Sequence, residues 1–245
     1  MNKLLVLIAM MLFIKTSNAQ TEMHYKILKL ADLHRAGQME NVSWDLSVKN
    51  YKQAQLENEL TVFVEAKTTA DNQFVLVSFR SPKKFEGQKL LVRNNSMWFS
   101  KKGVDRAIAI SGRQRLTGSA ANADIANANY FLDYNIKSVT EERLANTDCL
   151  VFHLIAKNNY VSYYHIKYWI SKDSNLGLKA EFYGKSDKLI KTAEFEYENP
   201  GNYNGKNIKL VSKTTIKDGV NHQDYTILHS SNFNFNTIST SKFEK

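Results

Sequence analysis

The sequence has 245 residues, of which 43% are hydrophobic, and it contains only two prolines and ten glycines. This composition excludes a disordered or collagen-like chain and supplies enough apolar surface for a buried core. The formal charge of +9 comes from scattered lysines and arginines rather than from one basic block, which argues against a nucleic-acid-binding protein.

The first predicted element is an export signal. Lys3 precedes an apolar run from Leu4 to Ile14, and a short polar stretch ends at Ala19. This layout is typical of a secretory signal peptide at residues 1–19, because the apolar run is too short to span a bilayer comfortably; a membrane anchor is the alternative. Cleavage after Ala19 would remove two lysines and lower the formal charge from +9 to +7.

A helix is expected at residues 21–36, ahead of all the strands. Apolar residues recur there at helical spacing, and Gly37 stands where the helix would end. The stripe consists of Met23, Ile27, Leu30, Ala31 and His34. It is the pattern of a helix that packs one face on a core.

From about Asn41 onward the apolar pattern has a period of two, as in β-strands. In the stretch ELTVFVEAK, the positions on one face are Leu60, Val62, Val64 and Ala66. Similar runs follow with turn residues between them, and Asp218-Gly219 is a strong hairpin signal. Roughly ten or eleven strands, with no helix between most of them, predict an antiparallel meander that curls.

A small, alanine-rich segment interrupts the strands at residues 115–130. Ser119 is a candidate N-cap, and a short helix is expected from about Asn122 to Phe131. Its apolar face would include Ile125 and Ala128. No linker rich in proline or glycine divides the chain, so residues 20–245 are expected to form a single domain.

The sequence offers no convincing catalytic or metal-binding pattern. His153 and His165 could meet on neighbouring strands, but a zinc site would need a third ligand that cannot be assigned. Cys149 lies in an apolar strand, where a core residue is the expected role and a nucleophile is the alternative. No nucleophile elbow or phosphate-binding loop is present. We therefore expect neither an enzyme nor a cofactor or metal.

The interior of the curled sheet is the remaining candidate for function. Alternation places a large set of aromatic and aliphatic side chains on one face of successive strands. Such an interior either fills with its own side chains or encloses an apolar ligand, and composition alone leaves both open.

The stretch SPKKFEGQKLLVRNNSMWFSKKGVDRAIAISGRQRLTGSAANADIANANY resembles the middle of the outer-membrane lipoprotein-sorting proteins, the LolA/LolB-like carriers. The matching pieces are Pro82-x-x-Phe85-x-Gly87, Leu90-Leu91, Met97-Trp98-Phe99, Arg106, Ile108, Gly118-Ser119 and Asp124-Ile125. The resemblance implies an unclosed antiparallel β-barrel, mainly β with α, covered by an N-terminal helix and a mid-chain helical lid. It also implies a periplasmic location and a non-enzymatic carrier that binds the acyl chains of lipoproteins or lipids for transfer toward the outer membrane.

Alternation and resemblance together give a set of candidate residues for the apolar cavity and lid: Val62, Val64, Trp98, Ile125, Phe131, Tyr164, Ile166, Tyr168, Phe182 and Phe195. Arg113 and Arg115 are candidates for a headgroup or a partner, with solvated loop arginines as the alternative. The expected partners are acyl chains and an inner- or outer-membrane protein, with the carrier itself a monomer. Two alternatives remain: an envelope regulatory or transporter-accessory module without lipid cargo, and an exported hydrolase.

Overall fold

The computed structural model describes residues 20–94, 96–101, 103–104, 106–126, 129–159 and 161–244, with only the backbone described at 115–117. The expected signal peptide at residues 1–19 lies outside the described residues, so cleavage after Ala19 stays a prediction. Among the described residues, every helix is too short or too polar to cross a bilayer.

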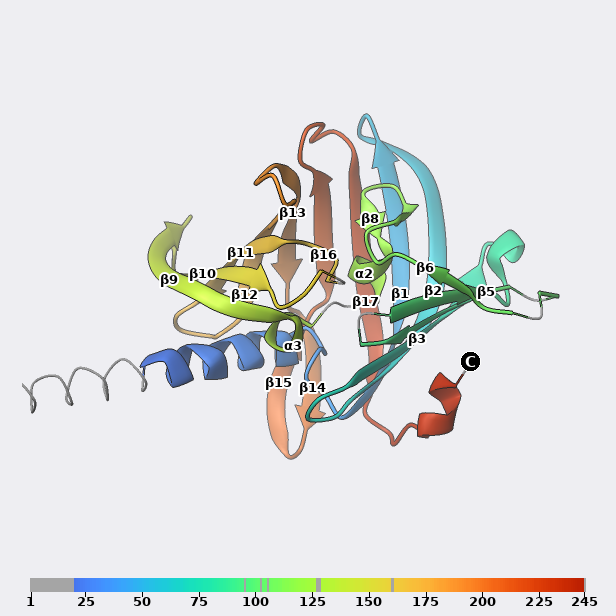
Figure 1. Ribbon diagram of the computed structural model, residues 1–245, viewed down its shortest axis with the longest axis horizontal. Helices are drawn as coiled ribbons and strands as arrows, with labels where there is room; N and C mark the ends of the chain where they lie inside the picture. Colours follow the sequence, from blue (N-terminus) through green and yellow to red (C-terminus); the bar gives the residue numbers. More distant parts are fainter. Residues whose placement is uncertain are drawn as a thin grey trace, which may run out of the picture.

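Thirteen antiparallel strands form one continuous, strongly curved sheet (Figure 1) in the order β6-β5-β4-β3-β2-β1-β17-β16-β13-β12-β11-β10-β9. One half contains β1 (Asn41–Lys52), β2 (Gln55–Thr68), β3 (Gln73–Ser81), β4 (Lys89–Arg93), β5 (Ser96–Ser100) and β6 (Ile108–Ile110). The other half contains β9 (Tyr134–Leu144), β10 (Thr147–Ala156), β11 (His165–Ser171), β12 (Gly177–Tyr183), β13 (Leu189–Glu196), β16 (Lys213–Asp218) and β17 (Tyr225–Asn234). The last strand, β17, pairs with the first, β1, and this pairing joins the two halves.

The predicted unclosed antiparallel sheet is confirmed, but the expected number of strands is too low. Seventeen strands are present among the described residues, and two small hairpins lie outside the main sheet. These are β7 (Arg115–Thr117) with β8 (Ala120–Ala121), and β14 (Asn199–Tyr203) with β15 (Lys206–Leu210). Strands this short carry no alternating apolar pattern, so periodicity does not detect them.

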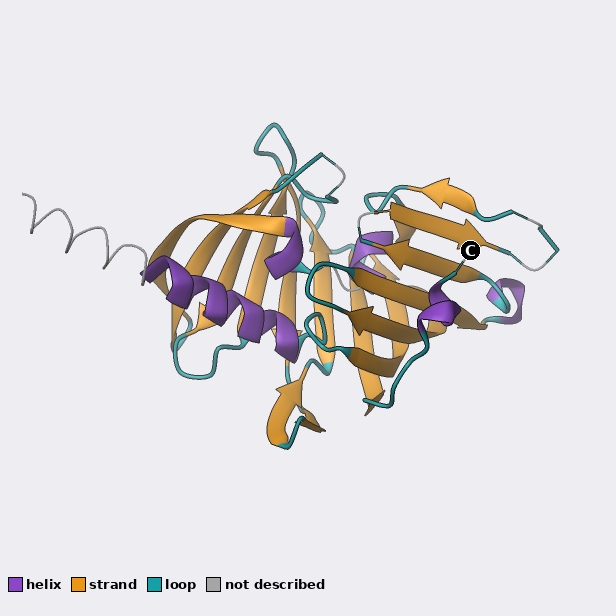
Figure 2. Ribbon diagram, turned by 60° about the horizontal axis from the view of Figure 1, so that its bottom comes forward, coloured by secondary structure: helices purple, strands orange, loops and turns teal. Residues whose placement is uncertain are grey.

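An N-terminal helix runs to residue 34 and crosses one half of the sheet (Figure 2). The helix is confirmed, but its buried face is shifted from the expected stripe. Leu28 and Ala31 are fully buried, whereas Met23 and Leu30 are 53% and 42% exposed. The reason is that the charged Asp32 belongs to the buried face, and a stripe chosen by apolar residues alone passes over it.

Residues 111–133, called the lid below, connect β6 to β9. They include the strands β7 and β8 and two short α-helices, α2 (Asn122–Ile125) and α3 (Tyr130–Asp133). The single helix expected from Asn122 to Phe131 is therefore two short ones, and Ala128 lies outside the described residues. The small side chains of Ala120, Ala123 and Ala126 are buried, which lets the lid backbone approach the sheet closely.

A C-terminal segment, residues 235–244, covers the outer face of β3, β4 and β5. It ends in the 3-10 helix η2 (Thr240–Phe243), and a second 3-10 helix, η1 (Lys83–Phe85), follows β3. Phe243 is fully buried against Leu76 and Leu91, and its carbonyl oxygen accepts a hydrogen bond of 2.9 Å from Arg93 Nε. The outer face of this half is thus a second, smaller core.

Replacing Phe243 with alanine is expected to lower the free energy of unfolding by about 3 kcal/mol, because it removes the central ring of this outer cluster. Val220→Ala is the control, since Val220 is 75% exposed and its loss is expected to change stability by less than about 0.5 kcal/mol. Urea unfolding of both variants measures the difference. Equal effects would mean that the C-terminal segment does not stabilise the sheet.

Candidate functional site

The inner face of the sheet and the lid enclose one apolar interior. Around its small central cavity lie Trp44 and Leu46 of β1, Phe182 of β12, Phe195 of β13 and Ile125 of α2. The cavity has a volume of about 50 Å³. Pockets that hold small organic ligands are larger, about 300–1,000 Å³. The interior is therefore packed by its own side chains while the lid lies in place.

Most of the predicted cavity residues do meet in this interior. Val62, Val64, Ile125, Ile166, Tyr168, Phe182 and Phe195 are all at most 8% exposed and belong to one cluster. Phe131 of α3 is partly buried at its margin, where its ring contacts Tyr25 of the N-terminal helix edge-on at 6.3 Å. The structure brings these side chains together; their role in binding a ligand stays a proposal.

Two predicted cavity residues lie elsewhere. Trp98 packs on the outer cluster with Phe243, because its neighbours Met97 and Phe99 take the inward positions of β5. Tyr164 is 38% exposed, because β11 begins only at His165 and the bend before it turns this ring outward. Neither side chain lines the interior.

The lid is attached to the middle of the sheet through Gly118 and Ser119. The Ser119 backbone N–H donates to Thr226 Oγ1 at 2.9 Å, and that hydroxyl donates to Asn50 Oδ1 at 2.7 Å. Gly118 has a φ of +52°, and a Cβ there would lie 2.2 Å from Asn50 Oδ1. Glycine is therefore required where the lid meets β1 and β17.

Ser119 is not the N-cap of a helix, contrary to expectation. The helix α2 starts three residues later, and its first turn is completed by Asp124, whose Oδ2 accepts from the Ala121 N–H at 2.7 Å. The Ser119 hydroxyl instead donates to the backbone oxygen of Asp224 at 3.2 Å. The residue holds the lid on the sheet rather than starting the helix.

A buried ion pair joins α2 to the inner face of β13. Lys191 Nζ contacts Asp124 Oδ2, and the two side chains are 4% and 9% exposed. The Tyr163 hydroxyl donates to the other carboxylate oxygen at 3.2 Å, and the Lys191 ammonium lies 4.5 Å from the centre of the Tyr163 ring. A buried charge that loses its partner is costly, so this contact opposes separation of the lid from the sheet.

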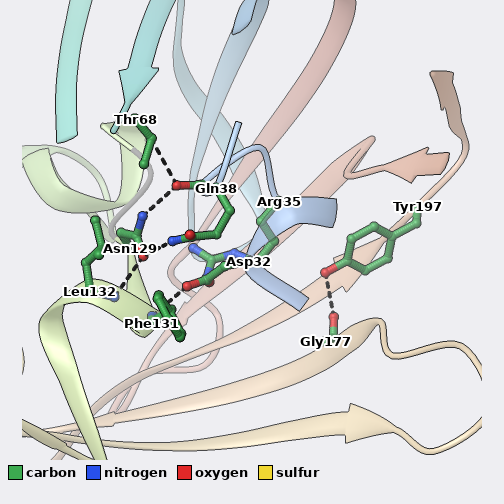
Figure 3. Close-up of polar contacts among 10 residues, drawn as sticks. Asp32, Arg35, Gln38, Thr68, Asn129, Phe131, Leu132, Gly177 and Tyr197 are labelled. Atoms are coloured by element: carbon green, nitrogen blue, oxygen red, sulfur yellow. Dashed lines mark hydrogen bonds and ion pairs between the residues drawn. The ribbon is translucent and has the colours of Figure 1, made fainter. Parts of the chain in front are cut away.

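The second lid helix, α3, is attached to the turn after the N-terminal helix (Figure 3). Asn129 caps α3, since its Oδ1 accepts from the Leu132 N–H at 3.0 Å, and the same oxygen accepts from Gln38 Nε2 at 2.7 Å. Asn129 Nδ2 donates to the Gly37 carbonyl oxygen at 2.5 Å. One asparagine thus connects two elements that are far apart in sequence.

Asp32 and Arg35 form a second buried ion pair below α3. Their side chains are 1% and 7% exposed, and Arg35 Nη1 lies 3.1 Å from Asp32 Oδ1. Asp32 Oδ2 also accepts from the Phe131 N–H at 2.7 Å (Figure 3). The Arg35 guanidinium lies 4.0 Å from the centre of the Tyr130 ring, so a charged group of the helix contacts an aromatic residue of the lid.

Burial dominates the titration of Asp32. It raises the pKa of Asp32 to about 6, against the opposing effects of Arg35 and of the backbone N–H groups that the carboxylate accepts. Burial also raises the pKa of Tyr130 and of Tyr168 well above the ordinary tyrosine value. These tyrosines therefore stay protonated and neutral near pH 7.

A pH dependence of stability follows from Asp32. Its pKa is higher in the folded chain than the ordinary value of 3.8, so its contribution to stability is full below pH 3.8 and is lost as the pH rises through about 6. Between pH 4 and pH 7 the wild type is expected to lose about 2–3 kcal/mol of unfolding free energy relative to Asp32→Asn. Urea unfolding of both proteins across this range measures it; a difference that does not change with pH would contradict the raised pKa.

The candidate arginine Arg113 does not stand free beside the interior. Arg113 is exposed, yet its Nε donates to the Ser162 carbonyl oxygen at 2.6 Å and its Nη2 to that of Val161 at 2.9 Å. It ties the lid to the segment before β11. The side chain of Arg115 lies outside the described part of the structure.

Cys149 is buried on the outer face beside Val151 and Trp169, and burial raises the pKa of its thiol. Among the described residues, no group of three or more histidine, cysteine, aspartate or glutamate side chains is arranged to hold a metal ion.

Sequence reasoning missed the four charged residues of the two buried pairs. A signal was present for Lys191, which shares its strand face with Ala193 and Phe195 and therefore had to point inward. Its partner Asp124 is contributed by a segment 67 residues away, and nothing in the local pattern identifies that pairing.

Comparison with known proteins agrees with this architecture. A family model described only as "Uncharacterized protein" matches residues 71–245. No curated protein matches the sequence. A LolA superfamily protein from Nitrosomonas europaea is similar in structure with a TM-score of 0.78 and 26% identity, over 90% of this chain and 96% of that one.

Two further solved structures share the fold. A DUF1329 family protein from Desulfovibrio piger has a TM-score of 0.72 and 20% identity, over 91% of this chain and 97% of that one. An outer membrane lipoprotein-sorting protein domain from Vibrio parahaemolyticus has a TM-score of 0.71 and 18% identity, over 89% and 95%. The family model covers most of the chain, so the chain belongs to that family, and the solved structures show that its fold is LolA-like.

Proposed function

We propose that this chain is a periplasmic, non-enzymatic carrier that binds the acyl chains of lipoproteins or lipids between its lid and the inner face of its sheet. Residues 20–245 would act as one unit after removal of the signal peptide. The observation that carries the proposal is the combination of a largely apolar inner face with a lid held over it by a few polar contacts. The LolA-like fold, which is that of a carrier or binding module, supports it.

The lid has to move for an acyl chain to enter, because the cavity beneath it is about 50 Å³. Lid movement would break the contacts of Ser119, Asp124 and Asn129 with the rest of the chain. Burial of the acyl chain would offset that cost at about 0.8 kcal/mol for each methylene. A chain of ten or more methylenes therefore supplies about 8 kcal/mol before the costs of association.

Native mass spectrometry tests the proposal directly. The full chain is expressed in a host with membranes, purified without detergent and weighed before and after extraction with organic solvent. We expect adducts with the masses of lipids or acylated molecules, which the extraction removes. Protein that carries no adduct and takes up no added phospholipid would contradict the carrier function.

A pair of neighbouring variants locates the bound chain. Ala193 is 2% exposed and lines the cavity, whereas Thr192 points to the other face of β13. Ala193→Leu places a larger aliphatic side chain in the cavity and is expected to reduce the lipid-bound fraction. Thr192→Leu introduces the same side chain on the outer face of β13 and is expected to leave the lipid-bound fraction unaltered.

The packed interior favours one alternative, a regulatory or transporter-accessory module without lipid cargo. In that case a membrane protein partner would co-purify with the chain while native mass spectrometry shows no lipid. The same purification therefore separates the two functions.

A further inference from the structure

A separate hollow of about 380 Å³ lies on the outer face of β9, β10 and β11. It is lined by Lys137, Ser138, His153, Ile155, Tyr164, His165 and Asp187. His153 alternates along β10 with Phe152 and Leu154, which are fully buried in the interior. The hollow is therefore on the opposite side of the sheet from the proposed acyl site.

Four polar side chains of this hollow have unused hydrogen-bonding capacity. Among the described residues, no hydrogen bond or ion pair engages Lys137 Nζ, the Ser138 hydroxyl, the imidazole of His153 or the Tyr164 hydroxyl. They come from two neighbouring strands and the bend before a third. All four groups can donate a hydrogen bond, and the ammonium cannot accept one. The ligand that matches such a set is an acceptor with several oxygen atoms.

Two of the three nearby carboxylates are already paired with lysines. Glu142 lies 3.7 Å from Lys167, and Glu181 lies 2.7 Å from Lys179. Asp187 lies 3.5 Å from His165 Nδ1, and its side chain is 80% exposed. Asp187 also lines the hollow, and among the described residues no ion pair joins any of the three carboxylates to Lys137.

The position of the second histidine is fixed by its neighbours. The His165 ring stacks on Tyr183 with ring centres 4.5 Å apart and lies beside Asp187. His153 faces Lys137, His165 and Lys167. Partial burial, and then these positive neighbours, lower the pKa of His153, and Glu142 is the one nearby acid that raises it. The same positive field would attract an anion to this hollow.

We propose that this outer hollow binds a small oxyanion of the phosphate type through Lys137, Ser138, His153 and Tyr164. Lys137 supplies the permanent charge, and the hydroxyl groups and imidazole supply directed donors. A bound anion favours the protonated imidazole, so binding is coupled to uptake of a proton by His153. Affinity for the anion therefore rises as the pH falls from 8 to 6.

NMR of the histidine side chains tests the site in the full chain. Inorganic sulfate is one probe, because its charge is constant between pH 6 and pH 8, and inorganic phosphate is the second. We expect both to shift the His153 and His165 resonances, with sulfate binding about threefold tighter at pH 6 than at pH 8, because a rise of one pKa unit from below 6.5 is only partly expressed at pH 6. Resonances that neither anion moves at millimolar concentration would overturn the proposal.

Two variants separate this site from general attraction to a basic protein. His153→Gln keeps a polar side chain but no titratable group, and it is expected to weaken sulfate binding at pH 6 about threefold and to abolish the pH dependence. His222→Gln is the matched control, since His222 is exposed in the turn between β16 and β17. Equal binding by the two variants, with both folded by circular dichroism, would overturn the proposal.

Vesicle flotation distinguishes the source of the phosphate group. Vesicles of phosphatidylcholine with phosphatidylglycerol are compared with vesicles of phosphatidylcholine alone. Binding to the anionic vesicles that His153→Gln weakens would assign the site to a lipid headgroup. Anion binding in solution without any effect of His153→Gln on vesicles would assign it to a soluble phosphate.

Discussion

Replacing Lys191 with methionine is expected to lower the free energy of unfolding by about 3–5 kcal/mol. The variant leaves Asp124 buried without its cation, and its remaining donors, the Tyr163 hydroxyl and the Ala121 N–H, do not balance the charge. Since this pair joins the lid to β13, the lid is expected to separate more easily, and lipid uptake should be faster than in the wild type. Urea unfolding and stopped-flow uptake of a fluorescent phospholipid measure the two effects.

A more exposed ion pair between β13 and its neighbour β16 provides the control. Lys213 pairs with Glu196 of β13 at 2.7 Å, and the two side chains are 32% and 52% exposed. Lys213→Met is expected to cost less than about 1 kcal/mol, because solvent screens such a pair. Adding Asp124→Asn to Lys191→Met is expected to recover part of the lost stability. If the two lysine variants are equally destabilised, the buried pair does not hold the lid.

Gly177→Ala is expected to be among the most destabilising single substitutions in the chain, at more than about 3 kcal/mol. A Cβ at Gly177 would lie 1.7 Å from the Tyr168 hydroxyl oxygen and 2.1 Å from the ring carbon that bears it. That ring is fully buried and cannot move aside freely. The Gly177 carbonyl oxygen also accepts from the Tyr197 hydroxyl at 2.8 Å, so a displaced backbone would lose this bond as well (Figure 3).

Gly184→Ala is the matched control for this substitution. A Cβ at Gly184 would meet its nearest atom, Ile190 Cδ1, at 3.7 Å, which is ordinary contact. This variant is expected to change stability by less than about 1 kcal/mol. Thermal unfolding of both proteins gives the comparison, and similar midpoints would show that the Tyr168 ring has room that the structure does not reveal.

Strand periodicity and the family resemblance together predict much of the interior. They place Tyr168, Phe182 and Phe195 among the inward residues, and the structure brings these side chains together. The same reasoning failed at Trp98, because the strands around it are apolar on both faces and alternation does not say which face is inner. The decisive contact, with Phe243, comes from the far end of the chain.

The lid shows the other limit of sequence reasoning. Its alanines and its Gly118-Ser119 pair indicated an interruption of the sheet, and the resemblance identified the interruption as a lid. Its polar contacts were not predictable, because Ser119 and Thr226 are separated by 107 positions. The side chain of each could equally form hydrogen bonds with residues close to it in the sequence. Short polar side chains favour caps and turns locally, so a serine read in isolation is assigned as a cap.

The central claim is that acyl chains bind between the lid and the inner face of the sheet. The most direct test uses a phospholipid with a photoreactive group midway along one acyl chain, followed by mass spectrometry of the cross-linked peptides. The account predicts cross-links to inward residues of β1, β12 and β13 and to α2, such as Trp44, Phe182, Phe195 and Ile125. Cross-links confined to the outer face, or none at saturating lipid, would contradict it.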